Sequence, residues 1–279
     1  MLVICDAPGQ TCNRLWTYVA SVAQCVAERR RMVILFYDWT IEDFPSLLHC
    51  PFIYYPLYHP WFLRLPKGWG WYKSLTWKTT HSRFFDRVFA ALGFTKGWQT
   101  RTDTRYLRAT LPELKRLFRP ADHIMARAEA MIARLRAEAD MVVGVHVRRG
   151  DYATWNDGRF FFSLDDYRQF MRRVEQCYAP RRVAFFISSN EDFSPADVFA
   201  PCHCQRFAGE PAAALLDLYT LSLCDRIIGP YSTYSRWASF IGEVPLCFCA
   251  SREQQFDDES FSKIVDYFHF ESGLTIDDW

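Results

Sequence analysis

Met141-Val142-Val143-Gly144-Val145-His146-Val147-Arg148-Arg149-Gly150-Asp151-Tyr152 is the stretch of sequence that decides the fold. Its first seven residues are almost continuously apolar, which predicts a strand buried on both faces of a sheet. Polar side chains follow at once, and open α/β sheets bind their ligands at the carboxyl ends of the strands. Because side chains alternate along a strand, we expect His146 and Arg148 to share one face and Arg149 to point the other way. The stretch therefore predicts a parallel α/β sheet with a ligand-binding edge.

On both sides of this stretch the hydrophobic pattern alternates between helix and strand. After it we expect helices at 164–178, 212–224 and 235–241 and strands at 183–188, 226–229 and 244–248. Before it we expect a strand at 2–5, a helix from about Asn13, a strand at 32–36, and helical sequence over 110–139. The sequence predicts two Rossmann-like α/β lobes, 1–139 and 140–279, with a cleft between them. Residues 40–105 break the pattern and form an aromatic and basic insert in the first lobe.

Composition excludes several classes of protein. The formal net charge of +1 over 279 residues argues against nucleic acid as a general partner. The ten cysteines are scattered and several lie in apolar runs, so we expect reduced thiols. Cys202 and Cys204 flank His203 but lack a second ligand pair, so we expect no metal site there. The sequence shows no targeting segment and no apolar run long enough to cross a bilayer, which predicts a cytoplasmic protein.

Arg148 is the strongest candidate ligand-binding residue. A guanidinium can bind a diphosphate through two parallel hydrogen bonds, and Arg148 follows directly after the buried strand. We expect Arg149 to have a structural role, pairing with Asp151 or another carboxylate and bracing the turn at Gly150. The alternative for an Arg-Arg pair at a strand end is two solvated structural cations.

Three further segments carry candidate residues, each with an ordinary structural alternative. Pro230-Tyr231-Ser232-Thr233-Tyr234-Ser235 lies between a strand and a helix, where hydroxyls and N–H groups either bind an anion or cap the helix. Asp217 is the only charged residue from 211 to 224, and such a carboxylate would accept hydrogen bonds either from a base such as guanine or from a structural partner. Gly9-Gln10-Thr11-Cys12-Asn13-Arg14 forms the first β-α turn and lacks the dinucleotide fingerprint.

Together these segments resemble the superfamily of α1,2-, α1,6- and protein O-fucosyltransferases, with the bacterial α1,2 enzymes (glycosyltransferase family 11) most similar in length and layout. His146 to Tyr152 is similar to the H-x-R-R-G-D-Y motif of that group. Ser232 to Trp237 resembles its S-T-F-S-W-W segment, with Tyr234 and Arg236 as departures. Gly9 to Leu15 resembles its glycine-rich opening, with Gln10 where glycine is common. The resemblance covers nearly the whole chain except residues 40–105.

The resemblance implies a GT-B-type fold, a GDP-fucose donor, inversion at the anomeric carbon and no metal cofactor. By position it implies that Arg148 holds the β-phosphate and that His146 and Asp217 hold the guanosine. It also implies that the phosphates meet Ser232, Thr233 and Tyr234. Asn13 then lies close to the sugar-phosphate, in the turn that Gly9 opens. The departures leave the acceptor and the linkage less certain than the donor, with an α1,2 linkage to a glycan expected.

The acceptor hydroxyl needs a proton acceptor within hydrogen-bond reach. Asp151 and Asp157 lie in or just after the motif, and Asp157 belongs to Trp155-Asn156-Asp157-Gly158, where an aspartate before glycine is also an ordinary turn residue. The sequence does not choose between them.

Residues 60–101 hold eight Lys or Arg residues against a single acid, Asp86, together with five tryptophans. Three interpretations stay open for this insert: a peripheral contact with the inner membrane face, a platform for a glycan or glycolipid acceptor, or a variable lobe with tryptophan in its core. For the whole chain the rival functions are transfer from another nucleotide sugar, glycan binding without catalysis, and binding of single-stranded RNA.

Overall fold

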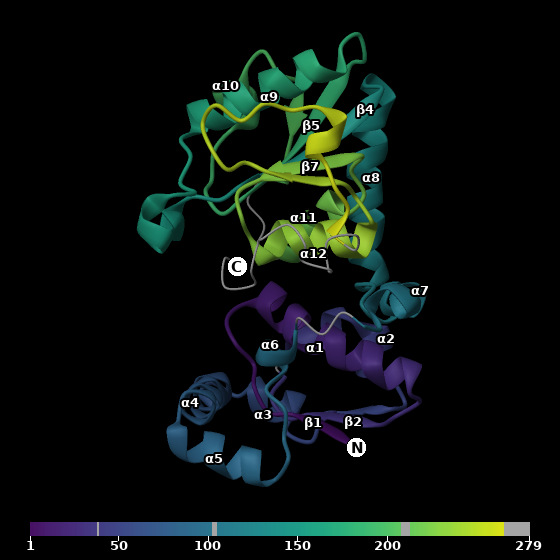
Figure 1. Ribbon diagram of the computed structural model, residues 1–279, viewed down its shortest axis with the longest axis vertical. Coiled ribbons are helices and arrows are strands. Elements are labelled where there is room, and N and C mark those ends of the chain that lie inside the picture. Colours follow the sequence, from purple (N-terminus) through teal and green to yellow (C-terminus); the bar gives the residue numbers. More distant parts are fainter. Residues whose placement is uncertain (38, 102–104, 208–212, 265–279) are drawn as a thin grey trace. The chain divides into compact units, whose positions relative to one another are not determined.

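The computed structural model describes residues 1–37, 39–101, 105–207 and 213–264 (Figure 1). The chain forms two compact units, Met1–Ala121 and Asp122–Trp279. Residues 102–104 of the insert, the predicted helix start at Ala212 and the end of the second predicted lobe, 265–279, lie outside the described residues.

The first unit is built on a small parallel sheet in the order β1-β2-β3, formed by Leu2–Ile4, Met32–Ile34 and Ile53–Tyr54. Helix α1 (Thr11–Ala27) connects β1 to β2 and buries most of the apolar face that the helical spacing predicted, with Val26 at its end half-buried. That face consists of Leu15, Tyr18, Val19 and Val22. The predicted β-α-β opening is therefore confirmed.

Short elements complete this unit. They are η1 (Trp39–Asp43), α2 (Pro45–Leu48), α3 (Pro60–Leu63), α4 (Gly68–Thr80), α5 (Arg83–Ala91), α6 (Gly97–Thr100) and α7 (Leu107–Leu117). Helices α6 and α7 pack against α1. The buried carboxylate of Asp6 accepts hydrogen bonds from the backbone N–H groups of Gly97 (2.7 Å) and Trp98 (3.1 Å), which joins the end of the insert to the end of β1.

The second unit holds a five-stranded sheet in the order β6-β5-β4-β7-β8, in which every neighbouring pair is parallel. The strands are β4 (Met141–Val147), β5 (Val183–Ser189), β6 (Cys204–Gln205), β7 (Arg226–Gly229) and β8 (Leu246–Phe248). β4, the first strand of this sheet in chain order, thus lies in the middle. The chain then adds β5 and β6 on one side of it and β7 and β8 on the other. The order therefore reverses between β4 and β7, and such a switch point is where open α/β sheets bind ligands.

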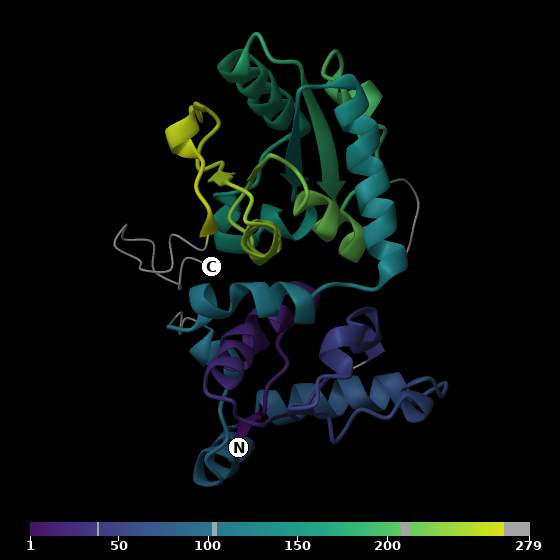
Figure 2. The ribbon, with the colours of Figure 1, turned by 90° about the vertical axis from the view of Figure 1, so that its right-hand side faces the viewer.

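Helices cover both faces of this sheet (Figures 1 and 2). On one face Val143, Val145 and Val147 pack against the buried side of α9 (Leu164–Tyr178), which is followed by α10 (Pro195–Phe199). On the other face α8 (Asp122–Glu138) and α11 (Ala213–Leu221) pack together, and α12 (Thr233–Gly242) contacts α11. Three short 3₁₀ helices lie in loops: η2 (Gly150–Ala153), η3 (Trp155–Gly158) and η4 (Asp258–Ser260).

Helix α8 belongs with the second unit, so the boundary between the two units falls between Ala121 and Asp122. The reason is its apolar face, where Ile124 and Ala128 pack against Leu216 of α11. Sequence periodicity shows that such a face exists but not which sheet it covers, so the predicted boundary between 139 and 140 falls after this helix and not before it.

All ten cysteines are free thiols, as expected from their scattered positions. Within the described residues no helix is long and apolar enough to cross a membrane.

Candidate functional site

The polar residues predicted at the edge of the second sheet lie where its strand order reverses. His146 is at the end of β4, and β7 leads into the loop Pro230–Ser232 and then into α12. A Cβ atom built on Gly229 would lie 2.9 Å from the Cβ of His146, so only glycine leaves β7 room to pair beside this histidine. The two loops that carry the motif residues therefore begin from adjacent strands.

The imidazole of His146 is buried, with 3% of the residue exposed. Its ring packs against the ring of Tyr234, with centroids 4.8 Å apart, and its Nδ1 has no hydrogen-bond partner. Burial and the charge of Arg148 lower the pKa of His146 to about 3, so the ring is neutral near pH 7. A neutral imidazole carries one donor and one acceptor nitrogen, and here one of them is available to a ligand.

Asp217 lies on α11 with 4% of the residue exposed, and its Oδ1 has no hydrogen-bond partner. Burial raises the pKa of this carboxyl to about 7, although a hydrogen bond with Ser188 and the charge of Arg206 both lower it. Ser188 is the register partner of His146 on β5. A buried carboxylate oxygen without a donor is unfavourable in the free protein, and a ligand that brings N–H donors would satisfy it.

Tyr234, in the first turn of α12, connects these groups. Its hydroxyl donates to the carbonyl of Ala214 (2.6 Å), one turn before Asp217 on α11, and lies 3.4 Å from the hydroxyl of Ser188. His146, Asp217 and Tyr234 are thus brought together around Ser188, although the family resemblance assigned Tyr234 to the phosphates and only His146 and Asp217 to the guanosine. Sequence reasoning missed Ser188, although its position after the apolar run 183–187 at a strand end was the available signal.

Ser232 is the N-cap of α12: its hydroxyl accepts a hydrogen bond from the backbone N–H of Tyr234 (3.2 Å). The capping interpretation is therefore confirmed for this residue. Capping does not exclude anion binding, since the helix dipole still favours negative charge near Ser232 and Thr233.

Tyr152 links the two loops. It is buried, and its hydroxyl donates to the carbonyl of Tyr231 at 2.5 Å. Next to it Gly150 has φ +57°, a left-handed conformation that glycine adopts readily. Tyr152 therefore fixes the loop that carries Arg148 against the loop that leads into α12, a role that the sequence did not reveal.

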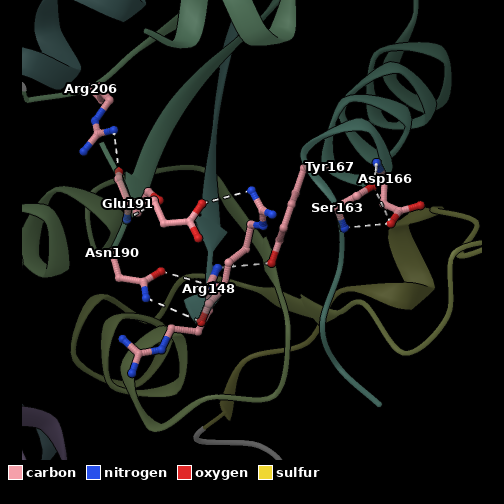
Figure 3. A network of polar contacts seen from close by, with 9 residues as sticks. Arg148, Ser163, Asp166, Tyr167, Asn190, Glu191 and Arg206 are labelled. Carbon is pink, nitrogen blue, oxygen red and sulfur yellow. Dashed lines mark hydrogen bonds and ion pairs between the residues drawn. The ribbon is translucent and has the colours of Figure 1, made fainter. Parts of the chain in front are cut away.

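Arg148 and Arg149 point in different directions, as strand alternation predicted. The Arg148 guanidinium forms an ion pair with Asp151 (2.8 Å) and lies 5.6 Å from the ring centroid of Tyr152. Its backbone N–H donates to the hydroxyl of Tyr167 (3.1 Å), a residue of α9 (Figure 3). The strand end is therefore held in place while the side chain stays at the half-buried edge of the site.

Arg149 pairs with a carboxylate, and its partner is Glu191 (2.9 Å), which follows β5. Asn190 accepts from the backbone N–H of Arg149 (3.1 Å), and the carbonyl of Glu191 accepts from Arg206 (2.9 Å). This network ties the ends of β4 and β5 together (Figure 3). Asp151, the other partner considered for Arg149, pairs with Arg148 instead.

The remaining candidates are Asp157, Gly9 and Asn13. Asp157 is exposed on η3 with φ +55°, next to Asn156, which is also left-handed. Gly9 and Asn13 belong to the first unit, where Gly9 has φ +58° and a Cβ there would lie 2.4 Å from Nδ2 of Asn13. Among the described residues there is no group of three or more His, Cys, Asp or Glu that could hold a metal ion.

Comparison with known proteins relates this chain to a glycosyltransferase family. The model of the family described as "Glycosyl transferase family 11" matches residues 92–265. A galactoside alpha-(1,2)-fucosyltransferase 1 from Oryctolagus cuniculus is 25% identical over 178 residues, which cover 58% of this chain and 44% of that protein. The chain thus spans less than half the length of this curated relative.

Two solved structures have a similar fold. The NodZ alpha-1,6-fucosyltransferase soaked with GDP-fucose superposes with a TM-score of 0.52 and 16% identity, covering 93% of this chain and 96% of that one. The apo form of POFUT1 gives a TM-score of 0.52 and 11% identity, covering 90% and 97%. The predicted GT-B fold of two Rossmann-like lobes is therefore confirmed.

Proposed function

We propose that this chain, which belongs to glycosyl transferase family 11, transfers fucose from GDP-fucose to a hydroxyl of a glycan or glycolipid. We further propose that the reaction inverts the anomeric carbon, needs no metal and forms an α1,2 linkage. The curated relative is named for an α1,2 linkage and one structural neighbour for an α1,6 linkage, so the proposed linkage rests on the curated relative.

The observation that carries the proposal is the pair of orphaned polar atoms, Nδ1 of His146 and Oδ1 of Asp217, buried at the sheet's switch point. Guanine presents a ring N–H and an amino group side by side, and a carboxylate accepts both. Uracil and cytosine lack that pair of adjacent donors. We therefore assign Asp217 and His146 to the guanosine.

The diphosphate is assigned to the neighbouring positive groups. Arg148 would hold the β-phosphate, and the start of α12 at Ser232, Thr233 and Tyr234 would face the phosphate oxygens with the positive end of the helix dipole. As GDP leaves, negative charge grows on the β-phosphate, and a fixed donor aimed at it is worth about 3–4 kcal/mol. Asn13 is assigned to the sugar-phosphate on the family resemblance alone.

Asp151 is the base that the geometry favours. In the free protein its carboxylate pairs with Arg148. A diphosphate that takes over the guanidinium would release Asp151, which could then accept the proton of the acceptor hydroxyl. Asp157, exposed in a left-handed turn, remains the second candidate.

The test is nucleotide selectivity followed by turnover. A ligand of the native state raises the melting temperature, so GDP should raise it while UDP and CDP at equal concentration should not. Asp217→Asn should remove the preference for GDP, and Ser260→Ala, which alters a hydroxyl in η4, should keep it. Equal stabilisation by all three nucleotides would contradict the assignment, and a protein that binds GDP but neither transfers nor hydrolyses GDP-fucose would be a glycan-binding relative.

A further inference from the structure

We propose that helices α3, α4 and α5 form a contact surface for an anionic lipid bilayer, distinct from the proposed donor site. This surface consists of the exposed side chains of residues 60–91. All of it belongs to the first unit, where α4 packs against both α3 and α5 (Figure 1).

Large apolar side chains are concentrated there. The three helices and their connections hold eight of the thirteen large hydrophobic residues that are exposed in the described part of the chain. Trp71 is 72% exposed, Trp61 70% and Phe84 69%. The others are Phe62, Leu65, Leu75, Trp77 and Phe85. So much exposed apolar area in one place marks an interaction site.

The helices themselves show which sides are free. Helix α4 buries Tyr72, Thr76 and Thr79 at helical spacing, which leaves Trp71 and Leu75 on its exposed side. Helix α5 buries none of its residues. Phe85 and Phe89 contact each other and Phe89 stacks on Phe94, but these contacts leave Phe84 69% exposed.

The charge identifies the partner. Residues 60–101 carry eight basic residues and one acid, Asp86, which is itself paired with Lys96 (2.6 Å). Five basic residues are exposed and form no ion pair with any described residue: Lys67, Lys73, Lys78, Arg83 and Arg87. A second copy of this surface would be repelled by the same charge, whereas an anionic surface would be attracted.

A lipid surface also accounts for the types of apolar residue. Tryptophan is enriched at the membrane–water interface, with Lys and Arg reaching the headgroups. Single-stranded RNA would use the aromatic rings and the cations, but it would gain little from the aliphatic Leu65 and Leu75. Because no described helix can span a bilayer, the contact is peripheral.

The experiment is co-sedimentation with vesicles, measured on the full chain. We expect binding to vesicles of phosphatidylglycerol and phosphatidylcholine at low salt, little binding to phosphatidylcholine alone, and release as salt is raised. One basic side chain at an anionic surface contributes roughly a factor of five in binding. The double variant Lys73→Gln/Lys78→Gln should therefore bind the vesicles at least about tenfold more weakly than the parent protein.

Two further variants test whether the vesicles bind at residues 60–91. Trp71→Ser/Leu75→Ser removes apolar side chains that are 72% and 52% exposed, and it should also lose vesicle binding. Arg134→Gln/Arg181→Gln removes the same charge from exposed positions of the second unit and should bind like the parent. Each variant is checked for folding by its melting temperature and for GDP binding, which should stay unchanged.

Three results would overturn the proposal: no vesicle binding at low salt, equal loss in the Arg134→Gln/Arg181→Gln control, or binding to single-stranded RNA but not to vesicles. Loss of the GDP response with intact vesicle binding would instead count against the proposed transferase function alone.

Discussion

At the scale of single residues, Arg148 makes the sharpest prediction. Arg148→Ala should lower kcat by roughly 10²–10³, because a fixed donor to the leaving diphosphate is lost. Arg148→Lys should recover little, since an ammonium cannot form the two parallel bonds of a guanidinium. Steady-state rates with GDP-fucose measure both. Near-normal turnover in either variant would remove Arg148 from the mechanism.

Asp217 connects donor binding to pH. Its pKa is raised to about 7 in the free protein. The population of the charged form, which we propose accepts hydrogen bonds from guanine, therefore falls as the pH drops below 7. GDP should then bind roughly tenfold more weakly at pH 6 than at pH 8, because one pKa unit corresponds to a factor of ten. Asp217→Asn should bind weakly at both values, and titration calorimetry on the two proteins separates this effect from protonation of the nucleotide.

The same carboxyl predicts a trade between function and stability. A raised pKa means that the folded state takes up a proton that the unfolded state lacks between about pH 4 and pH 7, so stability from this group falls as the pH rises through that range. Asp217→Asn should therefore raise the melting temperature at pH 8 and change it little at pH 5. The depressed pKa of His146 acts with the opposite sign and partly masks the trend in the parent protein. If Asp217→Asn melted at a lower temperature than the parent protein at pH 8, the Asp217 carboxylate would not be unsatisfied in the free protein.

At the scale of elements, a glycine sets how closely α11 approaches β4. A Cβ on Gly144 would lie 2.5 Å from Cδ2 of Leu221 and 3.2 Å from Sγ of Cys224. Gly144→Ala should therefore push α11 outward, lower stability by about 1–3 kcal/mol and weaken GDP binding by moving Asp217. Gly70→Ala, with nothing within 4 Å, is the control and should instead stabilise α4 by about 0.5–1 kcal/mol. Chemical denaturation together with GDP titration tests both variants.

The elements also show what could be predicted from sequence. The strand 141–147 matches β4, and the helix 164–178 matches α9, because each buries a continuous or periodic apolar face. Helices α3 to α5 were not predicted, since most of their large apolar residues are exposed and only Leu63 and Tyr72 among them are buried. The site shows the same contrast: His146, Arg148 and Asp217 follow from local pattern, whereas the Ser188 and Tyr152 contacts depend on which strands become neighbours.

At the scale of the whole molecule, charge is balanced overall but unevenly distributed. The net charge is +1, while residues 60–101 hold eight basic residues and one acid. The excess positive charge of that segment must be offset by acids elsewhere in the chain. Salt screens exposed charges strongly and buried ones much less, so salt should weaken vesicle binding far more than it weakens GDP binding in the buried site.

The last prediction concerns the source of positive charge in catalysis. The charge that develops on departing GDP is assigned to the guanidinium of Arg148 and to the N–H groups at the start of α12, both supplied by the polypeptide. Fucose transfer should therefore keep its rate after dialysis against EDTA and should not rise when Mg²⁺ or Mn²⁺ is restored. The Arg148→Ala variant provides the control, because its rate should be low under all three conditions. If EDTA abolished transfer and Mn²⁺ restored it, the leaving-group charge would be carried by a metal, and Arg148 would be left with binding alone.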